Sequence, residues 1–227
     1  TDGAIVDLGE SMLIRSQELV REDSTYTEAL LSIAGDDTVR IASLTRPADR
    51  SIILFSCGLT IHGVAPVFSP ELRWAVVGDG VAVTTSIDYE VMFHRDDAIV
   101  RILRRAIDPE PATWDAAIAA IGGSMRRPMR GGALVCDSEE VVEQRRMADV
   151  IPVIGALAPG PEGSLWVKRS AAWRAPAPID VFEADGTYRG TLPEGSPFPV
   201  AVMGDRIAAI ETASRQVQQL VVYRVVQ

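Results

Sequence analysis

Three arginines that stand close together form the most chemically distinctive group in this sequence. Arg126, Arg127 and Arg130 lie within the glycine-flanked stretch GGSMRRPMRGG, residues 122–132. A planar guanidinium can bind a carboxylate or a phosphate through two parallel hydrogen bonds. The stretch therefore predicts a flexible basic loop that binds an acidic group on a partner. The alternative is a solvated loop whose arginines pair with the protein's own acidic surface.

Trp173 is the second candidate contact residue. It lies in RSAAWRAPAP, residues 169–178, which the prolines predict to be a loop. An exposed tryptophan beside an arginine is typical of protein interfaces. Trp74 and Trp166 fall within predicted strands, and we expect both in the core.

Residue types that carry catalysis or bind metals are sparse. The chain has two histidines, His62 and His94, and no asparagine. His94 adjoins Arg95 and two aspartates, and we interpret this segment as a solvated turn between strands. Acidic pairs also fall at predicted turns, where aspartate bonds to the local backbone. No serine stands in a Gly-x-Ser-x-Gly context, so a nucleophile of that type is not expected. We predict no catalytic residue, no metal site and no cofactor.

The two cysteines, Cys57 and Cys136, match no metal-binding or redox motif. We expect two separate buried thiols. A single disulfide is the alternative if the compartment is oxidising.

Composition and charge limit the partners. The chain has 227 residues, of which 47% are hydrophobic, and a formal net charge of −9. This acidity argues against nucleic acid and anionic membranes as main partners. No stretch approaches the roughly 20 apolar residues of a membrane-spanning helix, so no transmembrane segment is predicted. The chain begins with threonine, without a signal-peptide pattern, which is compatible with a targeting segment that has been removed.

The elements that position these residues are short strands in a repeating pattern. The clearest repeat has strands at residues 73–77, 81–85, 89–93 and 98–104, with a hairpin turn at Gly78-Asp79-Gly80. Four antiparallel strands joined by tight turns are typical of one β-propeller blade.

Three further repeats are predicted. One covers residues 151–192 around Asp185-Gly186. Another covers residues 200–226 around Gly204-Asp205 and ends one strand short of a blade. A weaker repeat places strands at residues 4–8, 12–17, 26–33 and 39–44, and residues 52–55 form an extra strand. The fold class is therefore all-β, with about four four-stranded antiparallel units in a single domain, residues 1–227.

A helical insertion at residues 108–150 interrupts the repeats. Thr113 can cap a helix in which Trp114, Ala117, Ile118 and Ile121 share one face, and Gly122-Gly123 ends it. A second helix is predicted to follow Asp137 or Ser138, with glutamates in its first turn.

The order of these motifs carries a family resemblance. The segment WAVVGDGVAVTTSIDYEVMFHRDDAIVRILRR, the helical insertion, IDVFEADGTYRGTL and VAVMGDRIAAI together resemble the C-terminal part of bacterial six-bladed β-propeller proteins of the NHL-like type. The resemblance extends from about residue 67 to residue 227. It implies a secreted or lipoprotein-like propeller, usually without an assigned activity. At roughly 40–50 residues per blade, the chain would hold about four of six blades.

We therefore predict a non-enzymatic binding or scaffold module with a protein partner, as an extrinsic subunit of a larger complex. The expected location is periplasmic or extracellular, with membrane attachment through an N-terminal segment that is removed or absent. Residues 108–150 and 170–178 would supply the contacts. Two alternatives remain open: a metal-dependent hydrolase or lactonase-like propeller, and a cytoplasmic sensor or regulatory domain.

Overall fold

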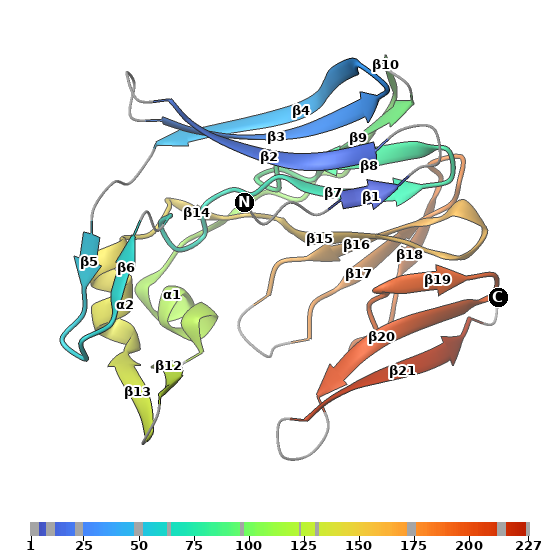
Figure 1. The fold of residues 1–227 in the computed structure, drawn as a ribbon. Helices are drawn as coiled ribbons and strands as arrows, with labels where there is room; N and C mark the ends of the chain where they lie inside the picture. Colours follow the sequence, from blue (N-terminus) through green and yellow to red (C-terminus); the bar gives the residue numbers. More distant parts are fainter. Residues whose placement is uncertain are drawn as a thin grey trace. The chain divides into compact units, whose positions relative to one another are not determined.

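The computed structural model is mostly β, with several antiparallel sheets and two α-helices among the residues that it describes (Figure 1). These residues are 5–7, 12–20, 25–47, 52–62, 65–95, 98–122, 124–129, 132–171, 176–212 and 217–225. The all-β prediction is confirmed at this level.

The chain divides into two compact units. The first contains Thr1–Leu72, Glu110–Ile151 and Ala172–Arg174, and the second contains Arg73–Pro109, Pro152–Ala171 and Ala175–Gln227. The prediction of a single domain with one insertion stays a prediction.

The first unit contains a four-stranded antiparallel sheet in the order β1-β2-β3-β4. Its strands are β1 (Ile5–Asp7), β2 (Met12–Val20), β3 (Thr25–Ala34) and β4 (Asp37–Pro47). Leu13 and Leu30 are fully buried in this sheet, and the carboxylate of Glu28 is buried between Arg15 and Arg46. The four strands of the weakest sequence repeat are therefore confirmed.

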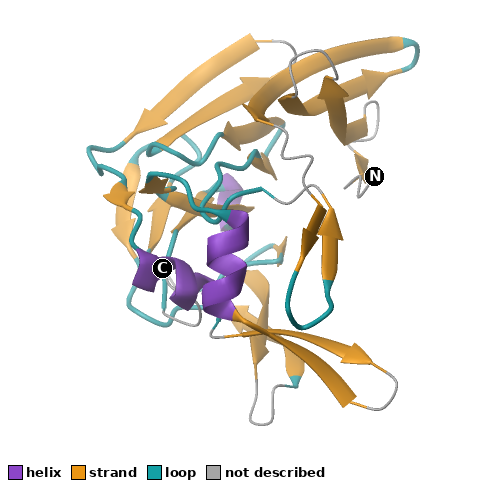
Figure 2. Cartoon of the chain, turned by 90° about the vertical axis from the view of Figure 1, so that its left-hand side faces the viewer, coloured by secondary structure: helices purple, strands orange, loops and turns teal. Residues whose placement is uncertain are grey.

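The rest of the first unit consists of short hairpins and two helices. The elements are β5 (Ile52–Leu54), β6 (Thr60–His62), β11 (Glu110–Pro111), α1 (Trp114–Ile121), β12 (Ser124–Met129), β13 (Gly132–Asp137), α2 (Ser138–Arg145) and β14 (Val150–Ile151). The strands pair as β5 with β6, β11 with β14 and β12 with β13. The two helices pack together through Ala117 and Val142 (Figure 2).

Both helices begin where the sequence predicts. Thr113 accepts a hydrogen bond from the amide of Ala116, and Gly122 ends α1 with a φ of 82°. Asp137 accepts a hydrogen bond from the amide of Glu139 and so caps α2. The loop predicted between the helices is wrong over residues 124–129, which form β12. The reason is that the backbone of this segment pairs along its whole length with β13.

The second unit contains three antiparallel sheets. The first has the order β10-β9-β8-β7, the middle one β15-β16-β17-β18, and the third β19-β20-β21. The strands are β7 (Arg73–Val77), β8 (Gly80–Thr84), β9 (Glu90–Arg95), β10 (Ala98–Arg104), β15 (Ile154–Pro159), β16 (Leu165–Arg169), β17 (Ile179–Phe182), β18 (Tyr188–Thr191), β19 (Ala201–Met203), β20 (Arg206–Thr212) and β21 (Gln218–Arg224). Three sequence repeats therefore become three sheets, and the third is one strand short, as predicted, within the described residues.

The middle sheet packs on both of its neighbours because its side chains alternate between two faces. Leu165 and Val167 join a buried cluster with Ala75 of the first sheet. Trp166, which lies between them in the sequence, joins a second cluster with Ile207 of the third sheet. The three sheets are thus stacked face to face.

The first strands of the three sheets are also neighbours. β15 lies beside both β7 and β19 (Figure 1). At the start of β15, the amides of Ile154 and of Val153, which precedes it, also donate to the carbonyl oxygens of Ser86 and Ile87 between β8 and β9, over 3.1 Å each. Successive sheets therefore meet along their leading strands.

The outer face of the third sheet is apolar and exposed. Ile210 pairs with Leu220 and Ala208 pairs with Val222 across β20 and β21, which places these side chains on one face. Leu220 and Val222 are 67% and 61% exposed. This face is the one that does not pack on the middle sheet.

Candidate functional site

The hairpin of β12 and β13 carries two of the predicted contact residues. Arg126 and Arg127 lie on β12 opposite Val135 and Leu134. The side chains of these two arginines, and Arg130 and Trp173 entirely, lie outside the described residues. The role of all four residues in partner binding stays a prediction. Arg126 and Arg127 lie on a paired strand instead of the flexible loop that the sequence predicts.

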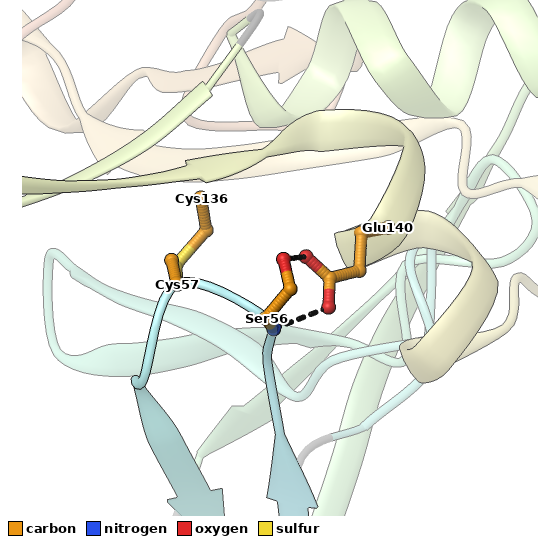
Figure 3. The surroundings of a disulfide bond; sticks show 4 residues. All are labelled: Ser56, Cys57, Cys136 and Glu140. Carbon is orange, nitrogen blue, oxygen red and sulfur yellow. Dashed lines mark hydrogen bonds between the residues drawn. A yellow bond between two sulfur atoms is a disulfide. The ribbon is translucent and has the colours of Figure 1, made fainter.

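A disulfide between Cys57 and Cys136 holds the base of this hairpin (Figure 3). Cys136 lies on β13, and Cys57 lies in the turn between β5 and β6. Their Cα atoms are 5.2 Å apart, a typical separation for bonded cysteines. The expectation of two separate thiols is wrong, because folding brings together two segments that are 79 positions apart.

Glu140 of α2 adds a second link at the same place. Its carboxylate accepts hydrogen bonds from the amide and the hydroxyl of Ser56, over 2.5 and 2.6 Å (Figure 3). Around the disulfide, Ile53, Phe55 and Val141 are buried in one apolar cluster with Cys136. The turn between β5 and β6 is therefore fixed to both β13 and α2.

This arrangement supports positioning better than catalysis. Both cysteines of the chain are consumed in the bond, so neither offers a thiolate nucleophile. The Glu140 carboxylate is occupied by two donors from Ser56. The site therefore provides a hairpin whose base is covalently bonded to the turn between β5 and β6.

The second unit has a buried polar cluster centred on Asp180, which the sequence analysis missed. The Asp180 side chain is fully buried on β17. Arg169 binds this carboxylate in a bidentate manner. Its Nε donates to Oδ2 and its Nη2 donates to Oδ1, each over 2.9 Å. The hydroxyls of Tyr89 and Thr191 donate to it over 2.7 and 2.5 Å. Arg169, Tyr89 and Thr191 thus supply four hydrogen bonds to one carboxylate.

Arg105 completes the cluster from the first sheet's side. Its guanidinium forms an ion pair with Asp180 at 2.7 Å. The same group lies over the ring of Tyr188 at 4.1 Å and over that of Tyr89 at 5.5 Å, measured to the ring centroids. A cation above an aromatic ring is attracted by the electron-rich face. The cluster therefore joins the first and middle sheets through charge, hydrogen bonds and ring contacts.

The pKa values in this cluster follow from its geometry. Burial alone would raise the pKa of Asp180, but the hydrogen bonds from Arg169, Thr191 and Tyr89 outweigh burial and hold that pKa far below its usual range. Burial, together with the bond to Asp180, raises the pKa of the Tyr89 hydroxyl far above its usual range. Near neutral pH Asp180 is charged and Tyr89 is protonated. Neither is suited to exchange a proton in a reaction.

The sequence contains a signal for this cluster. In IDVFE, residues 179–183, the period-two pattern places Asp180 on the same side of the strand as Phe182. A charged residue at such an inward position requires charged or hydrogen-bonding partners. The pattern indicates the need for partners, but it does not identify Tyr89 and Arg105, which lie far away in sequence.

His94 does not lie in a solvated turn, and that interpretation is wrong. It occupies β9 and is only 7% exposed, because the strand continues to Arg95. Burial lowers the pKa of its imidazole. His62 lies on β6, and its side chain is outside the described residues.

The described residues also bear on metal binding and on membrane insertion. Among those that the structure describes, no group of three or more His, Cys, Asp or Glu side chains is placed to hold a metal ion. No helix in the described part of the chain is both long and apolar enough to cross a membrane.

Comparison with known proteins gives no further assignment. Neither a scan against protein-family models nor a search of curated proteins found a match to this chain.

Proposed function

We propose that this chain is a non-enzymatic binding or scaffold module, built from propeller-type blades, that works in an extracytoplasmic compartment as part of a larger complex. The single observation that carries the proposal is the Cys57–Cys136 disulfide at the base of the β12–β13 hairpin. It bears both on where the protein works and on which surface it uses.

The disulfide favours an oxidising compartment. Structural disulfides persist in the periplasm and outside the cell, and they are rare in the reducing cytosol. Cys136 is almost completely buried in an apolar cluster with Phe55 and Val141. A bond packed in this way is part of the folded core of the first unit. This supports a periplasmic or extracellular location over a cytoplasmic sensor.

The proposed propeller character rests on the second unit. Its three sheets stack face to face, and their first strands lie beside one another, as the inner strands of adjacent blades do. The exposed apolar face of β20 and β21 is what the last blade of an incomplete ring would present. Both features support propeller-type blades in the second unit; the NHL-like family and a total of about four blades stay part of the proposal.

The β12–β13 hairpin is the proposed partner-binding element. A segment fixed before binding loses less conformational entropy when a partner docks. Arg126, Arg127 and Arg130 give this hairpin a concentration of positive charge on a chain of net charge −9. The partner that this chemistry fits is a protein with an exposed carboxylate or phosphate cluster.

Co-purification from the native host tests the binding surface. Changing Arg126, Arg127 and Arg130 together to Ala should release the partner that wild type retains, without moving Tm. The matched control changes Arg95, Arg104 and Arg224 to Ala, which removes the same charge from exposed ion pairs of the second unit. Retention of the partner by both triple variants would overturn the hairpin proposal.

Trapping thiols in intact cells tests the location. An alkylating agent added before lysis should label neither Cys57 nor Cys136, because the bond forms in the compartment where the protein works. Labelling of both cysteines in the wild-type chain would contradict an oxidising compartment. A Cys136→Ser variant, which leaves the partly exposed Cys57 as a free thiol, provides the positive control for labelling.

A further inference from the structure

β21 is the outermost strand of the third sheet in the second unit (Figure 1). The first and middle sheets each have a fourth strand beyond the corresponding position, whereas no described strand follows β21 in its own sheet. An outermost strand has unpaired backbone amides and carbonyl groups along one side, and the strand of another chain can pair with them. β21 is therefore an edge at which a fourth strand can be added.

The outer strands of the two complete sheets carry features that oppose such pairing. β10 and β18 each contain a β-bulge, because Val100 and Arg189 are additional residues in the pairing with the preceding strand. β10 also carries Arg101 and Arg104. Bulges and charged side chains are common protection for an exposed edge strand. Addition of a further strand at β10 or β18 is therefore disfavoured.

β21, all of whose residues are described, has neither protection along most of its length. It pairs with β20 residue for residue, without a register shift. The residues from Gln218 to Tyr223 are uncharged, and Arg224 at the end is the one charged residue of the strand. The side chains of Leu220 and Val222 are largely exposed. A regular, uncharged and apolar edge strand of this kind favours pairing with another strand.

The backbone groups of Leu220 and Val222 point toward this open edge. The amide of Val225 donates to the carbonyl oxygen of Asp205, which precedes β20, over 2.8 Å, so the backbone of Val225 faces β20. In an antiparallel pair the direction of hydrogen bonding alternates from one residue to the next. The odd-numbered residues of β21 therefore face β20, and the even-numbered residues, which include Leu220 and Val222, face outward.

The sequence of β21 is complementary to itself in an antiparallel pair. When a two-fold axis passes beside Val221, Leu220 lies opposite Val222 of a second copy, and both residues have outward-facing backbone groups that can bond. In the same register Arg224 lies opposite Gln218 of the second copy, so no like charges meet. In-register parallel pairing would place Arg224 beside its own equivalent, and like charges opposite each other are destabilising.

We propose that this chain forms a two-fold symmetric dimer in which the β21 strands of two copies pair antiparallel. The pairing joins the two third sheets into one continuous sheet, and each copy supplies a strand at the position that no described strand of the other fills. Leu220 and Val222 of the second copy lie side by side across the new pair, so each covers one flank of the other. The contact uses the second unit alone and does not depend on the function proposed for the β12–β13 hairpin.

Sedimentation equilibrium of the full chain tests the dimer. Between about 1 µM and about 100 µM, wild type should pass reversibly from monomer to dimer, with no larger species, because the dimer uses both open β21 edges. Val222→Pro removes an outward-facing amide and no hydrogen bond to β20, so it should weaken dimerisation at least about tenfold with little change in Tm. Val222→Ile keeps the amide and should dimerise like wild type. A monomeric wild type, or a Val222→Pro variant that dimerises equally well, would overturn the proposal.

Two changes at Gln218 test the register. Gln218→Glu places a carboxylate opposite Arg224 of the second copy, twice in each dimer, and should tighten dimerisation about three- to tenfold. Gln218→Arg places two arginines opposite each other and should weaken dimerisation by a similar factor. Within one copy the two positions are about 20 Å apart along the strand, so the effect arises between copies.

Thr212→Glu is the matched control for these changes. Thr212 is exposed on β20 and pairs with Gln218, so its replacement adds the same negative charge one strand further from the second copy. It should not tighten dimerisation. Equal dimerisation of Gln218→Glu and Gln218→Arg, or equal tightening by Thr212→Glu and Gln218→Glu, would overturn the antiparallel pairing. Because these changes leave every backbone hydrogen bond in place, they decide the proposal even if Val222→Pro fails to fold.

Discussion

The hydroxyl of Tyr89 donates a hydrogen bond to the carboxylate of Asp180 over 2.7 Å, although the two residues are 91 positions apart in the chain. Tyr89 immediately precedes β9 in the first sheet of the second unit, and Asp180 lies on β17 of the middle sheet. Both side chains are buried. The bond therefore fixes two stacked sheets relative to each other in a region of low dielectric, where an unpaired partner is costly.

Removing the Asp180 carboxylate should strongly destabilise the second unit. Asp180→Ala would leave Arg105 and Arg169 without their anion, and we expect a loss of about 3–5 kcal/mol in the free energy of unfolding. Tyr89→Phe removes one of several donors and should cost about 1–2 kcal/mol. Denaturant unfolding of both variants checks this order. Asp88→Ala, a change at an exposed neighbour of Tyr89, is the control, and an equal effect in all three would contradict the cluster's role.

The Asp180 cluster should also make stability sensitive to acid. Because the pKa of Asp180 is lower in the folded protein than in the unfolded chain, its stabilising effect is fully present above the unfolded pKa of about 3.9. The effect is lost as pH falls below that value toward the folded pKa. The stability difference between wild type and Asp180→Asn should therefore be constant near neutrality and shrink below about pH 4. Unfolding curves across this range measure it, and a constant difference would contradict the prediction.

The strand pattern could be predicted because it is local. Three turns are marked by residue type alone: Gly78-Asp79, Asp185-Gly186 and Gly204-Asp205. A strand precedes each of these turns and another strand follows it. The helix caps at Thr113 and Asp137 are local in the same sense. Each of these signals acts over a few residues. A turn or a helix cap can therefore be recognised from its own residues, without knowledge of the rest of the fold.

The candidate sites could not be predicted in this way, because they depend on distant segments. Nothing near Cys57 indicates that β13 will bring Cys136 beside it. The flanking glycines of β12 indicated a loop, but pairing with β13 overrides that local signal. The charged residues after His94 predict a turn at that position, whereas strand β9 extends through His94 to Arg95.

Loss of the disulfide should destabilise the first unit. The bond closes a loop between residues that are 79 positions apart in the sequence. Removing a disulfide that closes a loop of this length lowers the free energy of unfolding by about 3–5 kcal/mol. Changing both Cys57 and Cys136 to Ser should therefore speed hydrogen exchange at the buried amides of Val141 and Val142 in α2.

Ser56→Ala is the control for this prediction. It removes one of the two bonds to Glu140 and should cost only about 1 kcal/mol. Unchanged exchange at α2 in the double serine variant would show that the disulfide does not support the hairpin's surroundings.

The two glycines of the first predicted turn should respond differently to alanine, for different physical reasons. Gly78 has a φ of 61° and open space around it, so Gly78→Ala should cost about 1 kcal/mol through backbone strain alone. Gly78→Asn should cost less, because asparagine tolerates this region. At Gly80 an added Cβ would lie 2.6 Å from the backbone oxygen of His94 in the paired strand. Neither backbone can move without breaking the sheet, so Gly80→Ala should be the most destabilising of the three, and thermal unfolding that ranks it below Gly78→Ala would contradict this account.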